Sequence, residues 1–317
     1  VGTYRMPSEA VKTILPMALK LGYRHIDTAQ AYRNEAAIGT CLSEAIAAGT
    51  VRREDLFIVT KLMPSNQGEK AYDAMLESLE KLQLDYIDLI LVHWPGASGT
   101  PPESEENRVQ RDKSWQAFER LYREKKVRAI GVSNYTAKHL AAMCDPASGV
   151  AIPPQCNQIE WHPSLVQEEI HAFCAKHNIV VTAYSPFGEG RLVQPVPAAS
   201  HSTAADDGDD DQEKALLKQL DLDQIEAATK IAPEGMSRSQ LLLAWSLQST
   251  QGCVIPKASS ERHLADNWAI TETLARRASA SGSVLKLLDD AVMGRLDAYV
   301  ADPKHRKRFC WDPNTVA

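Results

Sequence analysis

The chain has 317 residues, of which 44% are hydrophobic and 24% are charged, so it can bury a large core and is typical of a globular protein. Its formal net charge of −6 provides no basic face of the kind that binds nucleic acid or an anionic membrane, and we expect neither partner. The length suits a barrel of alternating strands and helices, which takes about 250 residues plus insertions. We therefore expect one domain over residues 1–317.

The six cysteines are widely spaced and form neither a C-x-x-C pair nor the spacing of a zinc finger, which favours reduced thiols. No apolar run reaches the roughly 18 residues of a transmembrane helix. The residues after Val1 also lack the basic segment and apolar core of a secretory signal. These features predict a cytoplasmic protein.

Short runs rich in Val and Ile alternate with longer segments of helical spacing, which is the pattern of βα units around a parallel sheet. Strands are predicted, in chain order, at residues 1–5, 23–28, 56–62, 86–93, 127–133, 156–161, 179–185 and 252–256. Helices are predicted between them at residues 8–21, 35–48, 69–82, 114–125, 167–177, 237–247 and 261–268. Such strands can close into a barrel or form an open doubly wound sheet, and the alternation alone does not choose between them.

The glycine pattern favours the barrel. An open dinucleotide-binding sheet is expected to carry G-x-G-x-x-G after its first strand, whereas the segment that follows residues 23–28 reads AQAYRNEAAIG. We therefore predict the α/β class and a (β/α)8 TIM barrel with long loops at the C-terminal face of its strands.

Two segments interrupt the repeating pattern. Residues 189–215 are rich in Gly, Pro, Ala and Ser and include five aspartates between positions 206 and 211, which predicts a mobile acidic insertion loop. The aspartates lack the spacing of an EF-hand, so we do not expect calcium there. Residues 301–317 carry basic side chains followed by Phe309 and Trp311, and we predict an extension near the barrel mouth.

Polar and aromatic residues stand at the C-terminal ends of the predicted strands, where the active site of a parallel barrel lies. They are Asp27, Tyr32, Lys61, His93, Trp94, Ser133, Asn134, Gln158, Glu160, Tyr184, Ser185 and Lys257. Each also has a simpler explanation. Asp27 could cap a turn, Tyr32 could lie on the surface, and His93 could be a core histidine.

Lys61 changes how its neighbours are interpreted. A lysine that ends the apolar run LFIVTK is costly to bury without an anion, and Asp27 lies one predicted strand away. A positive charge beside Tyr32 is expected to lower the tyrosine's pKa from about 10 and to make it a proton donor. A neutral His93 could hydrogen-bond to a carbonyl oxygen and polarise it. Metal binding is the rival use of His93, but no H-x-x-x-H or H-E-x-x-H spacing accompanies it, and we expect no metal.

The chain resembles the aldo-keto reductases, in particular the aldose reductase-like members, in sequence blocks that span nearly its whole length. The blocks are YRHIDTAQAYRNE, IVTKL, DLILVHWP, AIGVSN, CNQIEWHP, VTAYSPFGEG and VIPKASSERHLADN, and they follow the family's order. The resemblance implies a monomeric oxidoreductase that uses NADP(H) to reduce aldehydes and ketones to alcohols. It also implies a catalytic tetrad of Asp27, Tyr32, Lys61 and His93, with Tyr32 as the general acid.

The same resemblance implies sites for the cofactor and the substrate. The cofactor-binding residues would be Gly2, Thr3, Asp27, Ser133, Asn134, Gln158, Tyr184, Ser185, Phe187, Gly188, Lys257, Ser259, His263 and Asn267. Within this set, it assigns Ser133, Asn134 and Gln158 to the nicotinamide carboxamide and Tyr184 to the nicotinamide ring. A small carbonyl substrate would lie against Tyr4, Tyr32, His93, Trp94 and Trp311.

The sequence departs from the family at positions that bear on the cofactor and the pocket. Ala258 stands where a serine is usual and His263 where an arginine is usual, so a 2′-phosphate has fewer donors; NADP(H) remains the expected cofactor, with NAD(H) as the alternative. Tyr4 and Met63 occupy positions where tryptophan is frequent.

Two other functions remain open from the sequence. A Schiff-base lyase could use Lys61 as its nucleophile, although a nearby Asp27 would keep this lysine protonated. A non-catalytic accessory or sensor module could bind the nicotinamide cofactor without turning over a substrate.

Overall fold

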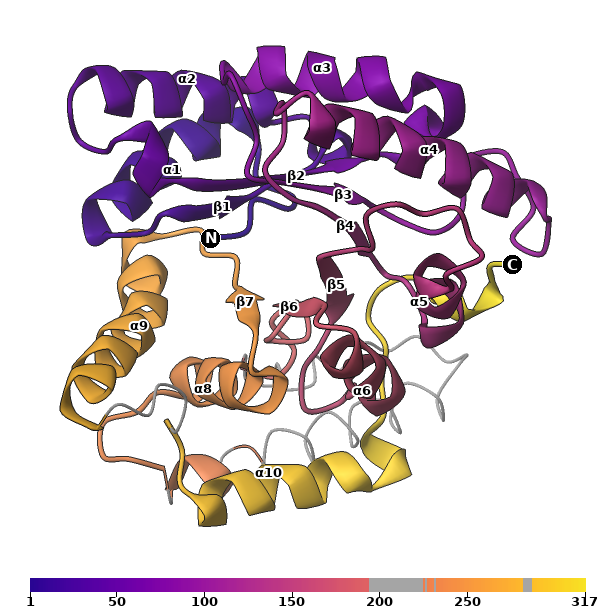
Figure 1. The fold of residues 1–317 in the computed structure, drawn as a ribbon. Coiled ribbons are helices and arrows are strands. Elements are labelled where there is room, and N and C mark those ends of the chain that lie inside the picture. Colours follow the sequence, from indigo (N-terminus) through magenta and orange to yellow (C-terminus); the bar gives the residue numbers. More distant parts are fainter. Residues whose placement is uncertain (194–224, 226, 231, 282–286) are drawn as a thin grey trace, which may run out of the picture.

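Seven parallel strands form the centre of the molecule and follow one another in chain order (Figure 1). They are β1 (His25–Asp27), β2 (Phe57–Leu62), β3 (Leu89–Val92), β4 (Ile130–Ser133), β5 (Cys156–Glu160), β6 (Val180–Tyr184) and β7 (Cys253–Ile255). This computed structural model describes residues 1–193, 225, 227–230, 232–281 and 287–317.

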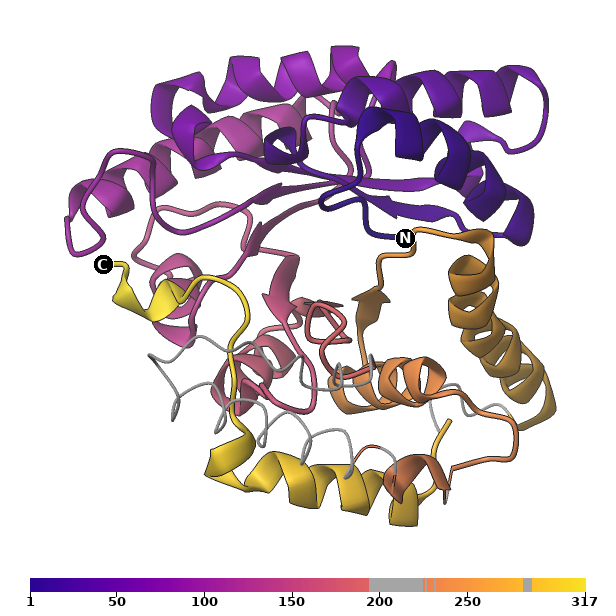
Figure 2. The ribbon, with the colours of Figure 1, turned by 180° about the vertical axis from the view of Figure 1, so that it is seen from behind.

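Helices lie outside the strands and connect each strand to the next (Figures 1 and 2). They are α1 (Ser8–Leu21), α2 (Glu35–Ala47), α3 (Ala71–Leu82), α4 (Glu106–Arg123), α5 (Ala137–Cys144), α6 (Glu168–Lys176), α8 (Arg238–Thr250), α9 (Glu261–Ser281) and α10 (Asp290–Ala301). Because a helix returns the chain to the same end of the sheet each time, all the strands run parallel.

The predicted first strand, residues 1–5, is reduced to a single bridging residue. Gly2 pairs in parallel with Asp27 of β1 on one side and with Lys257, just after β7, on the other. Its amide donates to the Pro256 carbonyl at 3.0 Å. The strand goes no further because the chain turns at residues 4–5, where the Met6 amide donates to the Thr3 carbonyl at 3.0 Å and Arg5 adopts φ of 52°. Gly2 nevertheless joins the two edges of the sheet, so the fold is the (β/α)8 barrel that the sequence predicts.

The strands are buried on both faces, as expected for a parallel sheet covered by helices. In β2 and β3, Val59 and Leu91 belong to a small apolar cluster inside the barrel. Their neighbours Ile58 and Ile90 belong to the larger cluster beneath the helices. Alternate residues of a strand therefore face the barrel interior and the helices, which is the period-two pattern that also directs the polar residues at the strand ends.

Four helices differ from the sequence prediction, and one of them, α9, begins at Glu261 as predicted but extends to Ser281 rather than to residue 268. Helix α4 begins at Glu106 rather than at residue 114, because its first turns are polar and carry ion pairs such as Arg108–Asp112 instead of an apolar stripe. Helix α5 was not predicted, since it is short and its capping box pairs Thr136 with His139 rather than with Glu or Gln. Helix α10 was also missed, although the Asp289 side chain caps it.

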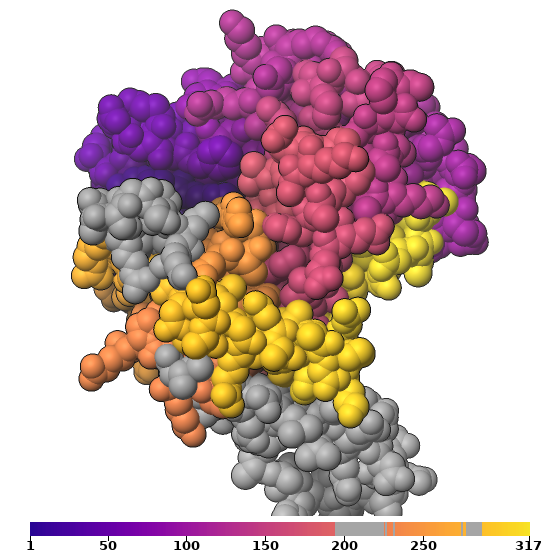
Figure 3. Space-filling model, turned by 60° about the horizontal axis from the view of Figure 1, so that its bottom comes forward, coloured from indigo at the N-terminus to yellow at the C-terminus, as the bar shows by residue number. Residues whose placement is uncertain are grey.

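The C-terminal part of the chain packs against the barrel. Helix α10 lies at the surface against orange-coloured residues earlier in the chain (Figure 3), and the Trp245 indole of α8 donates to Asp297 at 3.2 Å. Residues 302–317 then run past the end of β5 toward α4 and α5 (Figure 2). Of the predicted acidic loop at residues 189–215, the part from residue 194 onward lies outside the described residues.

Candidate active site

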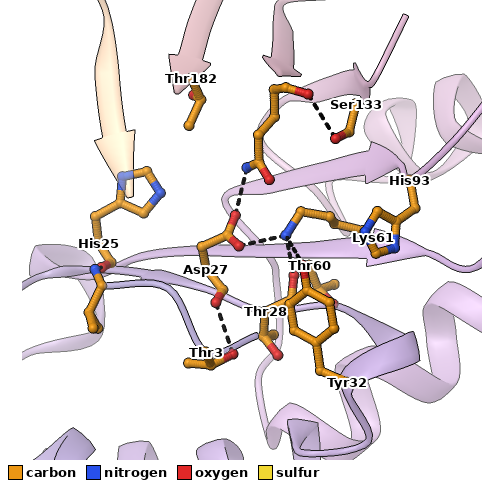
Figure 4. A network of polar contacts seen from close by, with 12 residues as sticks. Thr3, His25, Asp27, Thr28, Tyr32, Thr60, Lys61, His93, Ser133 and Thr182 are labelled. Carbon is orange, nitrogen blue, oxygen red and sulfur yellow. Dashed lines mark hydrogen bonds and ion pairs between the residues drawn. The ribbon is translucent and has the colours of Figure 1, made fainter. Parts of the chain in front are cut away.

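Strand register places the polar residues at one end of the barrel. Lys61 follows Val59 by two positions, so its side chain turns to the barrel interior, and His93 stands in the same relation to Leu91. Asp27, the last residue of β1, is paired with Val59. The three side chains consequently converge at the carboxyl end of the strands, where Figure 4 shows them with Tyr32.

The Lys61 ammonium group lies at the centre of this arrangement and is completely buried. Its Nζ donates to Asp27 Oδ1 at 2.5 Å, to the Thr28 carbonyl at 2.8 Å and to Tyr32 Oη at 3.4 Å. These three acceptors match the three protons of an ammonium group. Burial lowers the pKa of Lys61, while the contact with Asp27 opposes that effect.

Asp27 is held at both carboxylate oxygens. Oδ1 accepts from Lys61, and Oδ2 accepts from the side-chain amide of Gln158 at 2.7 Å. The Thr3 hydroxyl donates to the main-chain carbonyl of Asp27 at 2.9 Å. Because every oxygen has a donor, this carboxylate is fixed in orientation toward the lysine.

Tyr32 ends a short 3-10 turn, Gln30–Tyr32, that follows β1. Its ring packs against Tyr4 with centroids 5.2 Å apart and against the edge of His93 at 5.7 Å. Burial, followed by the negative charge of Asp27, raises the pKa of Tyr32 well above its usual value of 10. The expected lowering of this pKa by Lys61 is therefore wrong: removal from water disfavours the phenolate, and Tyr32 is a neutral phenol at physiological pH.

His93 is a buried, neutral imidazole. Burial, together with the charge of Lys61, lowers its pKa to about 3. Its Nδ1 atom is buried and has no hydrogen-bond partner. Its backbone is fixed, because the carbonyl accepts from the side-chain amide of Asn134 at 2.9 Å. A neutral ring held this way next to a phenol can donate to a carbonyl oxygen without carrying charge.

The residues predicted for the nicotinamide form a network beside these four side chains. The Tyr184 hydroxyl donates to Asn134 Oδ1 at 2.7 Å, and the Asn134 amide also donates to Ser133 Oγ at 3.1 Å. Ser133 in turn donates to the Gln158 carbonyl at 2.8 Å. This cluster of amides and hydroxyls at the ends of β4, β5 and β6, with the half-buried ring of Tyr184, fits the polar amide and flat ring of a nicotinamide.

Two cations stand together at the rim. The Lys257 side chain is largely exposed and donates to the Arg5 carbonyl at 3.3 Å. Partial desolvation of its ammonium group, together with the charge of Arg5, lowers the pKa of Lys257. Arg5 contacts Glu189 at 3.5 Å, whereas Lys257 has no carboxylate partner within the described part of the chain. An unneutralised positive charge here fits the phosphates of a dinucleotide.

The other predicted cofactor residues flank this rim. Ser185 and Gly188 form a sharp turn after β6, with φ of 52° and 53°, and Phe187 lies half-buried between them. Ser259 precedes α9, while His263 and Asn267 lie within that helix. Asn267 is buried, whereas His263 is exposed and faces solvent.

The predicted substrate residues fall into two groups. Tyr4 packs on Tyr32, whereas Trp94 lies beside His93 and meets the ring of Trp311 edge-on at 4.9 Å. Trp94 and Trp311 line a pocket of about 320 Å³ together with Pro64, Val316 and residues of the loop 96–102. The structure thus brings together two aromatic residues far apart in the sequence.

Sequence reasoning missed the part played by Gln30. Its side-chain oxygen accepts from the Met63 amide at 3.1 Å, and its nitrogen donates to the Ala74 carbonyl at 2.8 Å. Gln30 thereby fastens the turn that carries Tyr32 to the loop after β2. The only available signal was its place two residues before a tyrosine at a strand end.

Within the described residues, no group of three or more His, Cys, Asp or Glu side chains is arranged to hold a metal ion. None of the helices in that part of the chain is both long enough and apolar enough to cross a membrane. All six cysteines are free thiols.

Known proteins share this sequence pattern and fold. Residues 1–278 match the family model of the Aldo/keto reductase family. The chain is 35% identical over 255 residues to a 9,11-endoperoxide prostaglandin H2 reductase of Trypanosoma cruzi, covering 80% of this chain and 74% of that protein. It is 36% identical over 266 residues to a glyoxal reductase of Bacillus subtilis, covering 82% of this chain and 76% of that protein.

The chain also resembles solved structures over nearly its whole length. An aldose reductase of Giardia lamblia matches with a TM-score of 0.74 and 32% identity, over 98% of this chain and 93% of that one. An aldo-keto reductase of Bombyx mori in complex with NADP matches with a TM-score of 0.71 and 30% identity, over 96% of this chain and 89% of that one. The chain therefore belongs to the aldo/keto reductase family.

Proposed function

We propose that this oxidoreductase reduces aldehydes or ketones to alcohols with NADPH, and that Tyr32 is its general acid. The observation that carries the proposal is the position of a neutral phenol between a buried ammonium group and a neutral imidazole. Phenol and imidazole can both donate to one carbonyl oxygen, so charge that develops on this oxygen meets two donors. The reductases of Trypanosoma cruzi and Bacillus subtilis support the reaction class.

Each residue of the tetrad has a distinct part in this proposal. Tyr32 delivers its proton to the carbonyl oxygen, and Lys61 stabilises the phenolate that remains, since its Nζ already contacts Oη. Asp27 holds the Lys61 ammonium group in place and balances its charge while Tyr32 is protonated. His93 orients the carbonyl oxygen as a neutral donor. The rings of Tyr4 and Trp94 pack on Tyr32 and His93 and shield them partly from water, which strengthens these contacts.

NADPH would be held by the residues at the ends of β4, β5 and β6 and by the cations at the rim. When bound, its nicotinamide supplies the hydride that the carbonyl carbon receives. Lys257, with Arg262 or His263, would contact the 2′-phosphate, which favours NADPH over NADH. The Bombyx mori relative solved with NADP supports this choice. We also propose that the protein is a monomer, which light scattering would check.

The site disfavours Schiff-base chemistry at Lys61. A nucleophilic lysine must be deprotonated and must reach the substrate. The Lys61 side chain is fully buried, and its three protons have three acceptors. Borohydride trapping of a lysine adduct in the presence of substrate would overturn this assignment.

The test is the loss of reduced-nicotinamide absorbance for wild type and Tyr32→Phe. Wild type is expected to turn over small and aromatic aldehydes with NADPH, and the variant is expected to lose about 10²–10⁴-fold in kcat. The variant should bind NADPH as tightly as wild type, because the phenol is assigned to the substrate side. Tight cofactor binding without turnover of any carbonyl by wild type would instead favour a sensor module.

A further inference from the structure

Glu160, the last residue of β5, holds the C-terminal segment through a buried carboxylate. Its side chain is inaccessible to solvent. Oε1 accepts the backbone amide of Phe309 at 2.8 Å, and Oε2 accepts that of Cys310 at 3.2 Å. A single carboxylate thus satisfies two consecutive amides of a segment about half the chain length away in sequence.

The environment of Glu160 favours its ionised form. His162 Nε2 lies 3.0 Å from Oε1, and the Arg308 guanidinium lies 3.9 Å from Oε2. Although burial alone would raise the pKa of Glu160, the contacts with His162 and the two amides lower it below its usual range. Hydrogen bonds to an ionised acceptor are roughly twice as strong as neutral ones. Charge-assisted hydrogen bonds therefore help to anchor the segment.

Neighbouring contacts fix the same segment in register. The Lys307 amide donates to the Ser164 carbonyl at 2.7 Å. The Arg308 guanidinium donates to Gln167 Oε1 at 3.0 Å, and the Gln167 amide donates to the Glu160 carbonyl at 2.8 Å. Residues 307–310 are docked in this way on residues 160–167.

Trp311 follows this anchored segment directly. It is 45% exposed, so little apolar burial holds it in place, yet its ring meets Trp94 edge-on at 4.9 Å. Beyond it, the Val316 carbonyl contacts His139 Nε2 at 3.1 Å, and the Ala317 amide donates to the Pro102 carbonyl at 2.8 Å. The segment that forms one wall of the 320 Å³ pocket is thus fastened on both sides of Trp311.

We propose that Glu160 is a positioning residue for substrate choice: its carboxylate sets Trp311 against Trp94 and so shapes a pocket for carbonyl compounds with an apolar, aromatic body. The inference rests on the proposed function, because it concerns the substrate of the same site. The Glu160 carboxylate contacts His162 and the segment that carries the wall, and it makes no hydrogen bond to the tetrad, so its replacement should change the binding of large substrates and leave the tetrad intact.

Glu160→Gln tests the anchor by hydrogen exchange. The replacement keeps the shape of the side chain but turns one acceptor into a donor that faces an amide. Exchange at the amides of Phe309 and Cys310 is expected to quicken by about tenfold, with no change at β2. Glu119→Gln is the matched control, because Glu119 is also buried and accepts the amides of Ala151 and Ile152 at 2.7 and 3.0 Å. It should quicken exchange at residues 151–152 only.

Kinetics test the effect on substrate choice. In Glu160→Gln, the KM for benzaldehyde is expected to rise by about fivefold at unchanged kcat, while the KM for glyceraldehyde stays the same. Trp311→Ala removes the wall itself and should also raise the KM for benzaldehyde, and the double variant should add little to that rise, because both changes act on one wall. Glu119→Gln should change neither KM.

The outcomes separate the inference from the function on which it rests. Wild type that reduces benzaldehyde, together with unchanged exchange or an equal rise in both KM values in Glu160→Gln, overturns the inference alone. Wild type that reduces no carbonyl overturns the proposed function and the substrate role with it. If Glu160→Gln does not fold, Arg308→Gln serves instead, because it removes the guanidinium group that lies beside the Glu160 carboxylate. Arg308→Gln should raise the KM for benzaldehyde but not that for glyceraldehyde. An unchanged KM for benzaldehyde would overturn the inference.

Discussion

Nζ of Lys61 lies 2.5 Å from Oδ1 of Asp27, and solvent reaches neither side chain appreciably. A buried ion pair contributes little net stability when intact, since desolvation offsets the attraction, but the loss of one partner leaves an uncompensated charge. Because Lys61 also contacts Tyr32, loss of this ion pair should both destabilise the barrel mouth and impair the proton transfer proposed for Tyr32.

Lys61→Met is expected to lower the free energy of unfolding by about 3–5 kcal/mol, because it leaves Asp27 buried and unpaired. Adding Asp27→Asn should recover part of this loss, since no charge then remains buried. Neither Lys61→Met nor the double variant with Asp27→Asn should reduce carbonyl substrates. Chemical denaturation and the reductase assay measure the two effects, and an unchanged stability of Lys61→Met would contradict the buried pair.

The pH dependence of reduction should be flat over the physiological range. Tyr32 must be protonated to act, and burial raises its pKa well above 10, so kcat/KM is expected to fall only above about pH 10. His93 acts as a neutral ring with a pKa of about 3, so it adds no acidic limb above about pH 4. A profile at saturating NADPH that breaks near pH 6.5 would show that His93 titrates like an exposed histidine.

Acid should destabilise the fold through buried histidines. Burial lowers the pKa of His25 and His139 to about 4 and that of His93 to about 3, against an ordinary value of 6.5. Their neutral forms are favoured in the folded protein, so stability is retained above pH 6.5 and lost as the pH falls toward 4. The loss is expected to reach about 1.4 kcal/mol per pH unit for each proton taken up on unfolding.

His139→Gln should reduce the slope of the free energy of unfolding against pH by the amount that corresponds to about one proton between pH 6 and 4.5. Denaturant unfolding at several pH values in that range measures this slope. His177→Gln, at an exposed position, is the matched control and should leave the slope as it is. An equal change in both variants would assign the slope to other groups.

Cofactor choice should depend on Lys257. Lys257→Met is expected to weaken NADPH binding by about tenfold or more and NADH binding by clearly less, because a charge-assisted contact to the 2′-phosphate is lost. Lys20→Met, which removes an exposed lysine of α1, is the control. Fluorescence titration with both cofactors gives the two Kd values; an equal loss for both would place Lys257 at phosphates that the cofactors share.

The sequence by itself determined the barrel and the residues at its mouth. Apolar runs of strand length and helical segments are local patterns, and the period of two in a strand directs Lys61 and His93 inward once Val59 and Leu91 face the interior. The convergence of Asp27, Lys61 and His93 follows from parallel strands ending at one face.

Only the tertiary structure decided how the barrel closes, how Tyr32 titrates and what holds the C-terminal segment. Gly2 pairs with both sheet edges, and Glu160 meets an amide 149 residues away, so neither contact has a local signature. The pKa of Tyr32 depends on how completely the assembled site excludes water, and here desolvation is the largest cause of its rise. Local periodicity encodes elements, whereas burial and long-range contacts arise only when those elements pack.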